Sequence, residues 1–117
     1  MRLLLLVQTH WLACTLVLLA VISLASLSPL DALPPAPGSD KLHHLVAYAI
    51  LVFPLALRKP SGWLLMVLAL VLYSGAIELV QPYVNRHGEW MDMAANSAGL
   101  GCGCIMARGM HRFFNQT

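Results

Sequence analysis

The chain has 117 residues, of which 59% are hydrophobic and only 10% are charged. Soluble domains carry roughly a quarter charged residues on average, so this composition excludes an ordinary soluble fold. The formal net charge of +2 is too small to indicate nucleic-acid binding. The length predicts a single domain over residues 1–117.

The first apolar segment follows Arg2 and runs from about residue 3 to residue 27. A signal-peptide core has only about 7–15 apolar residues, and Ser23-Leu24-Ala25 is a poor cleavage site. We therefore predict a retained first membrane helix. The polar run from Gln8 to Trp11 leaves an alternative open, in which these residues mark the membrane interface.

Three further apolar segments follow, at residues 40–57, 63–81 and about 90–107. Each is close to the roughly 20 residues that a bilayer-spanning helix requires. Loops rich in proline, glycine and charged residues separate them. The fold class predicted from the four segments is all-α, a polytopic membrane bundle of four transmembrane helices.

The basic residues predict the orientation of this bundle. With the N-terminus in the cytoplasm, only Lys41 and Arg86 lie outside. Five of the seven basic residues then lie inside: Arg2, Arg58, Lys59, Arg108 and Arg112. This asymmetry is what the positive-inside rule requires, so we expect both termini to be cytoplasmic.

Small residues recur every four positions in the fourth segment, at Ala95, Gly99, Gly103 and Ala107. Such a stripe lets another helix backbone approach closely. We expect it to pack inside the bundle, and a homo-oligomer formed through Ala95, Gly99 and Gly103 is the alternative.

Polar residues gather at the ends of the helices that this topology places outside. Helical spacing puts Asp40, His44 and Tyr48 on one face of the second helix, and Asp92 and Asn96 on one face of the fourth. We expect one outward-opening site. Its candidate ligand-binding residues are Asp40, Lys41, His44, Tyr48, Glu78, Gln81, Arg86, Asp92 and Asn96.

Several of these residues also have a purely structural interpretation. Asp40 and Asp92 stand at helix N-termini, where carboxylates cap backbone N–H groups. His43 and His87 are interpreted as interfacial residues, and Tyr48 as a packing residue with a polar tip. The exception is Glu78, which lies at a helix C-terminus where the helix dipole disfavours an anion. We expect Lys41 or Arg86 to neutralise it, unless it is protonated.

The order of these residues resembles a known family, the VanZ-like membrane proteins. Asp40-Lys41, His44 and Ala47-Tyr48 match its D-K-x-x-H-x-x-A-Y block. Glu78 and Gln81 match its E-x-x-Q block, and the third block, R-x5-D-x3-N-x2-G, is matched by Arg86, Asp92, Asn96 and Gly99. The resemblance covers the chain from about residue 40 onward. Its one departure is Val84-Asn85, where the family often has Pro-Gly before the arginine.

The resemblance implies a multi-pass protein of the bacterial cytoplasmic membrane, in a family named for lowered susceptibility to teicoplanin. From the residues, we expect a non-enzymatic protein that binds an anionic envelope lipid, a glycolipid or a lipid-linked envelope precursor at its outer face. Helix N-termini, Lys41 and Arg86 would bind phosphate, and the acids would orient these cations or accept hydrogen bonds from sugar hydroxyls.

The alternative is a membrane-embedded hydrolase or transferase acting on a phosphorylated or glycosylated lipid. Its candidate catalytic residues are His44, Asp40, Glu78 and Asp92, with His44 as general base beside an aspartate. A divalent metal on His44, Glu78 and Asp92 would fit this alternative. No metal-binding spacing such as H-E-x-x-H is present, so we predict no metal and no cofactor. Transport is disfavoured because four short helices show no internal repeat.

Overall fold

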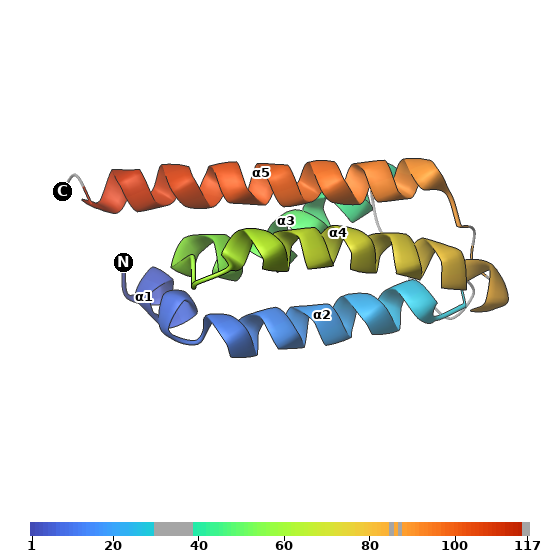
Figure 1. Cartoon of the computed structure of the whole chain (residues 1–117), viewed down its shortest axis with the longest axis horizontal. Helices are drawn as coiled ribbons and strands as arrows, with labels where there is room; N and C mark the ends of the chain where they lie inside the picture. Colours follow the sequence, from blue (N-terminus) through green and yellow to red (C-terminus); the bar gives the residue numbers. More distant parts are fainter. Residues whose placement is uncertain (30–38, 85, 87, 116–117) are drawn as a thin grey trace.

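The computed structural model describes residues 1–29, 39–84, 86 and 88–115, and all regular structure within them is helical. Helices α1 and α2 come first, and α3 and α4 are followed by a short 3₁₀ helix, η2, and by α5 (Figure 1). The start of α1 and the end of α5 lie at the same end of the bundle. The helix bounds are Arg2–Thr9, Trp11–Leu27, Asp40–Arg58, Trp63–Val80, Gln81–Val84 and Trp90–Asn115.

The first predicted helix is in fact two helices, α1 and α2, bent by 81° at His10. The prediction of one continuous helix from residue 3 to residue 27 is therefore wrong. The break falls in the polar run that starts at Gln8, whose side-chain amide donates to the carbonyl oxygen of Leu57 at 3.0 Å. Thr9 donates to the carbonyl oxygen of Leu5 at 2.8 Å. The Gln8 bond joins α1 to the end of α3, whereas the Thr9 bond lies within α1.

Two of the described helices are long and apolar enough to cross a membrane, the segments Asp40–Arg58 and Trp63–Val84. A third span is added if the bent pair α1 and α2 is counted as one. Helix α5 extends to Asn115, past the predicted end near residue 107, and spans about 39 Å at 1.5 Å per residue. It is not among these candidates, because Asp92, Asn96 and several glycines dilute its apolar content.

The closest packing in the bundle joins α3 to α5. A Cβ atom added at Gly99 would collide with the carbonyl oxygen of Leu45, and one at Gly103 with that of Ala49. Both glycines are therefore required for the two backbones to touch, as in small-xxx-small packing. The expectation that the stripe packs inside the bundle is confirmed, since α3 covers its glycines. Leu51, Leu55 and Leu100 fill the core beside it, each at most 1% exposed.

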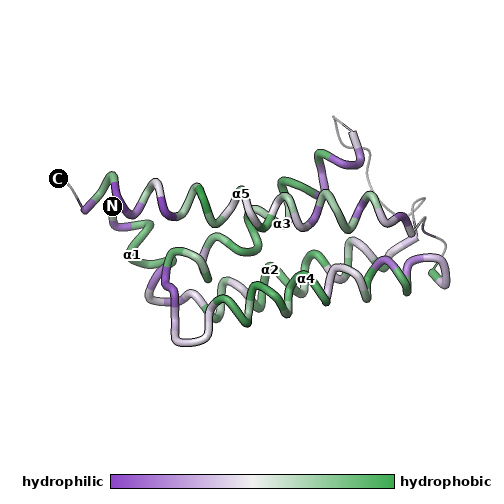
Figure 2. The backbone as a smooth tube through the Cα atoms, turned by 45° about the horizontal axis from the view of Figure 1, so that its top comes forward, coloured by the Kyte–Doolittle hydropathy of each residue, from purple (hydrophilic) through white to green (hydrophobic). Residues whose placement is uncertain are grey.

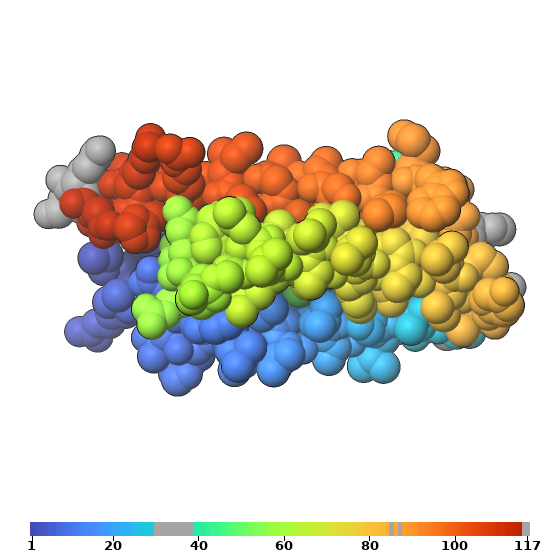
Figure 3. Space-filling view, in the orientation of Figure 1, coloured from blue at the N-terminus to red at the C-terminus, as the bar shows by residue number. Residues whose placement is uncertain are grey.

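Helices α2 and α4 complete the bundle around this pair. In the space-filling view α4 lies between α5 and α2 on the near face (Figure 3). Leucines on its outer side are widely exposed, among them Leu65 and Leu72 at 72% and 64%. An apolar groove of about 840 Å³ also opens between α2, α3 and α5. An apolar outer surface of this kind suits contact with lipid chains.

Charge is sorted by the ends of the bundle, and hydrophilic residues concentrate at both ends (Figure 2). The described acidic residues all lie at the end where α3 and α5 begin: Asp40, Glu78, Glu89 and Asp92. The five basic residues that were expected to be cytoplasmic lie at the end where α3 and α5 finish, or at the start of α1. The described charged residues therefore give the two ends of the bundle net charges of opposite sign.

Candidate functional site

The starts of α3 and α5 bring together six polar residues, which we call the α3–α5 cluster. Ser39 fixes the start of α3, because its hydroxyl oxygen accepts the N–H of Leu42 at 3.1 Å. Ser39 therefore caps the helix, and the carboxylate of Asp40 remains available to the cluster. The members are Asp40, Lys41, His44, Glu89, Asp92 and Asn96.

Lys41 is the cation of this cluster. Its ammonium group donates to Oδ1 of Asp92 and, at 2.6 Å, to Oε2 of Glu89. It also lies 3.9 Å from Oδ2 of Asp40. Asp92 is only 3% exposed, whereas Lys41 and Glu89 are 42% and 54% exposed. The lysine therefore compensates a buried carboxylate while remaining open to solvent.

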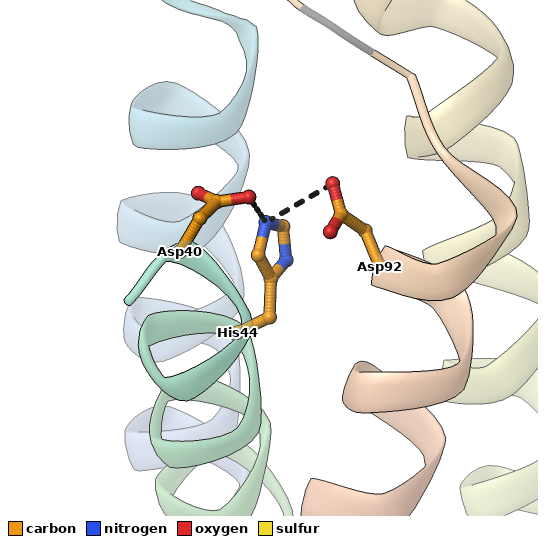
Figure 4. A group of neighbouring side chains, drawn as sticks. All are labelled: Asp40, His44 and Asp92. Carbon is orange, nitrogen blue, oxygen red and sulfur yellow. Dashed lines mark ion pairs between the residues drawn. The ribbon is translucent and has the colours of Figure 1, made fainter. Parts of the chain in front are cut away.

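His44 stands between the two aspartates (Figure 4). Its Nδ1 lies 2.9 Å from Oδ1 of Asn96, a hydrogen bond that the imidazole donates if Nδ1 carries the proton. Its Nε2 lies 3.6 Å from Oδ2 of Asp40 and 3.6 Å from Oδ2 of Asp92. The two residue pairs that the sequence predicted at i, i+4 spacing, one on α3 and one on α5, therefore face each other. The His44 side chain is 11% exposed.

Glu78 does not form the predicted ion pair with Lys41 or Arg86. Its Oε2 instead accepts the backbone N–H of Glu89 at 3.0 Å, and its Oε1 has no hydrogen-bond partner among the described residues. The side chain is 4% exposed. The physical reason is that the backbone N–H of Glu89 reaches the carboxylate, while Lys41 bonds to Glu89 and Asp92 and Arg86 bonds to the end of α2.

Gln81 and Arg86 lie in a second polar group, which we call the α2 clamp. Arg86 donates to the carbonyl oxygens of Ala25 and Ser28 at 2.7 and 3.1 Å. Gln81 donates to that of Ser26 at 3.1 Å. These carbonyls end α2, where unpaired acceptors and the negative end of the helix dipole favour a cation. The expectation of one site that includes both residues is therefore corrected, because their donors stabilise a helix end.

Four buried polar atoms have no hydrogen-bond partner among the described residues, and one of them belongs to the cluster. They belong to Tyr48 (Oη), Glu78 (Oε1), Gln81 (Oε1) and Asn96 (Nδ2), all within the described part of the chain. Each residue is at most 4% exposed. Orphaned buried atoms are rare in proteins and point to an additional water, ion or ligand. Tyr48 is thus a packing residue, as interpreted, whose hydroxyl also belongs to this unsatisfied set.

One group of possible metal ligands exists among the described residues: Asp40, His44 and Asp92, whose ligand atoms all lie within 4.8 Å of one another. This differs from the trio predicted for the enzyme alternative, because Asp40 takes the place of Glu78. The helical spacing of Asp40 and His44 brings both to Asp92, whereas Glu78 is turned toward the backbone of Glu89.

Glu89 was missing from the predicted site residues. It holds the cluster together, since its side chain accepts from Lys41 and its N–H binds Glu78. A lone glutamate in a loop has no spacing signal, so only its position just before α5 could have indicated this role. His43 is exposed on α3, and His87 lies outside the described residues.

Comparison with protein-family models, with curated proteins and with solved structures gave no match.

Proposed function

We propose that the chain is a multi-pass protein of the bacterial cytoplasmic membrane, with four spans, cytoplasmic termini and the α3–α5 cluster on the outer side. The separation of charge supports this, because the basic end would face the cytoplasm under the positive-inside rule. Helix α5 is long enough to span the roughly 30 Å hydrocarbon core and to project beyond it. The bent pair α1 and α2 then supplies the first span.

Cysteine labelling in intact cells tests this topology. The background has Cys14, Cys102 and Cys104 replaced by serine, since these are the cysteines of the chain. Ser39→Cys at the cluster end should react with a membrane-impermeant maleimide. Ser61→Cys, in the turn after α3 at the opposite end, is the matched control and should react only after the membrane is opened. The reverse pattern would invert the proposed orientation.

For the function, we infer that the cluster binds the polar head group of an anionic envelope lipid or glycolipid. The observation that carries this is a buried carboxylate, Asp92, joined through Lys41 to exposed Asp40 and Glu89 at the mouth of the bundle. Acceptors outnumber donors in this arrangement. The excess favours a sugar-bearing head group, whose hydroxyls donate to carboxylates while Lys41 contacts a phosphate.

Native mass spectrometry tests this proposal, with the protein in a detergent that contains no sugar, such as lauryldimethylamine oxide. The probes are phosphatidylglycerol, a glucosyl diacylglycerol and a polyprenyl-phosphate sugar. The sugar-bearing lipids should be retained more strongly than phosphatidylglycerol, and Asp92→Asn should remove that preference. Equal retention of all three probes by the wild type would contradict it.

A second candidate is a hydrolase or transferase acting on the same class of lipid. The observation in its favour is His44, whose ring is held by Asn96 and flanked by Asp40 and Asp92, as an acid–base histidine would be. Incubation with the polyprenyl-phosphate sugar should then release free sugar and polyprenyl phosphate in equal amounts, with water as the second substrate, and with an added sugar acceptor it should release polyprenyl phosphate and the glycosylated acceptor. His44→Gln should stop this release, and an unchanged lipid with wild-type protein would exclude this reaction.

The resemblance to VanZ-like proteins extends the proposal to teicoplanin susceptibility. Expression in a susceptible host should raise the inhibitory concentration of teicoplanin, and Asp92→Asn should not. An unchanged inhibitory concentration with the wild type at full expression would contradict this extension.

A further inference from the structure

The space between His44 and the two aspartates has the wrong dimensions for direct hydrogen bonds. Nε2 of His44 lies 3.6 Å from one oxygen of each carboxylate, beyond ordinary hydrogen-bond distance. If Nδ1 donates its proton to Asn96, Nε2 carries a lone pair. Three electron-rich atoms then face a common centre, an arrangement that suits a cation between them.

The charges around this centre also favour a cation. The cluster and Glu78 contribute four carboxyl groups, and Lys41 is their only ion-paired lysine or arginine among the described residues. Glu78 is 4% exposed, and its Oε1 has no hydrogen-bond partner among the described residues. A buried carboxylate oxygen without a partner is costly unless a cation or a proton neutralises it.

We propose that Asp40, His44 and Asp92 bind a divalent transition-metal ion, Zn²⁺ or Mn²⁺, through Oδ2, Nε2 and Oδ2. Ligand atoms at about 2.0–2.2 Å from zinc in a tetrahedron stand roughly 3.3–3.6 Å apart. The two distances of 3.6 Å from Nε2 meet this requirement. Since the remaining separation is at most 4.8 Å, a small rotation of the 62% exposed Asp40 closes the site.

The neighbours of the three ligands have the arrangement of a metal site's outer shell. A metal-bound histidine usually donates its other N–H to an oxygen that fixes the ring, and Oδ1 of Asn96 is placed to accept it. Lys41 contacts Oδ1 of Asp92 and leaves Oδ2 facing His44. With three protein ligands, the ion keeps at least one coordination position open toward the mouth of the site. A phosphate or sugar oxygen of a head group could take that position.

The test is metal binding by the full-length protein in lauryldimethylamine oxide, after removal of metal with a chelator. Isothermal titration with Zn²⁺ and with Mn²⁺ should give one site per chain for at least one of the two ions. Co²⁺ should give the visible absorption of a site with a nitrogen ligand and low coordination number. Absence of one-to-one binding for all three ions would overturn the proposal.

Variants locate the ion. His44→Gln should abolish one-to-one binding, whereas the neighbouring His43→Gln and the distant His10→Gln should bind as the wild type does. Asn96→Ala should weaken binding by about 10- to 100-fold, and Asn96→Asp, which restores an acceptor for Nδ1–H, should recover it. Lys41→Gln should tighten binding, because it removes a positive charge beside the ion. Loss of binding in His43→Gln with retention in His44→Gln would place the ion elsewhere and refute the site.

This inference does not rest on the proposed head-group function, since no lipid probe enters the titrations. One-to-one metal binding without lipid selectivity would refute the function and keep the site. Lipid selectivity that survives the chelator would keep the function and refute a role for the metal in it.

Discussion

The α3–α5 cluster and the α2 clamp lie at the same end of the bundle and use similar residues, yet their bonds differ in kind. In the clamp, Gln81 and Arg86 donate to backbone carbonyls that end a helix. In the cluster, side chains pair with side chains, and the acids exceed the cations. Donors that bond to backbone carbonyls stabilise the fold. Side chains with an excess of carboxylates over cations, at the open end of the bundle, remain available to a ligand. Charged residues in one motif therefore need not share one role.

The largest expected effect comes from separating the helices that carry the cluster. Gly99→Leu places a side chain where the carbonyl oxygen of Leu45 lies. The neighbour is backbone, so we expect destabilisation of at least about 3 kcal/mol, at or above the upper range for overpacked cores. Gly101→Leu is the matched control, because a Cβ there meets nothing within 4 Å. Thermal unfolding in detergent measures both, and equal melting temperatures would contradict the close contact.

A smaller loss of stability is expected for Arg86→Ala, a substitution that tests whether the clamp and the cluster act independently. Arg86→Ala removes two hydrogen bonds from a charged donor to the end of α2, with an expected cost of about 1–2 kcal/mol in unfolding free energy. Metal affinity should stay at the wild-type value, because no ligand moves. Asp92→Asn should instead lose metal binding, because it removes one of the proposed ligands. A loss of metal affinity in Arg86→Ala would join the two regions into one site.

The smallest effect is expected for Glu78→Gln. The amide keeps an oxygen that can accept the N–H of Glu89, so the expected change in unfolding free energy is below about 1 kcal/mol. Because Glu78 has no contact with Arg86, the combination with Arg86→Ala should be additive to within about 0.5 kcal/mol. A double-mutant cycle measures this. Coupling well above that value would restore the ion pair expected from the sequence.

The sequence predicted the parts of the fold and site that follow from periodicity. Apolar length placed α3 and α4 to within a few residues, and the four-residue spacings predicted that Asp40 and His44 share a face, as do Asp92 and Asn96. Four spans and cytoplasmic termini stay predictions. The bend at His10 was not predicted as a break, because long apolar segments flank the polar run from Gln8 to Trp11 on both sides. It depends on a bond from Gln8 to the distant Leu57.

The partners of Glu78, Gln81 and Arg86 could not be predicted for a related reason. Each bonds to a backbone group in another segment, and backbone N–H and C=O groups are present at nearly every residue. Sequence indicates which side chains need a partner, but the choice among backbone groups depends on how a loop runs. Charge complementarity alone suggested Lys41 or Arg86 as the partner of Glu78. In the structure its partner is the backbone N–H of Glu89.

The tight pairing of α3 with α5 has a consequence for synthesis, since α4 lies between them in the chain. During translation, Asp40 and His44 emerge long before Asp92 and Asn96, and α4 cannot replace α5 because it contacts α3 only sparsely. The half of the cluster on α3 therefore stays incomplete until α5 has been made, and a chain halted before α5 has Asp40 and His44 without their partners Asp92 and Asn96.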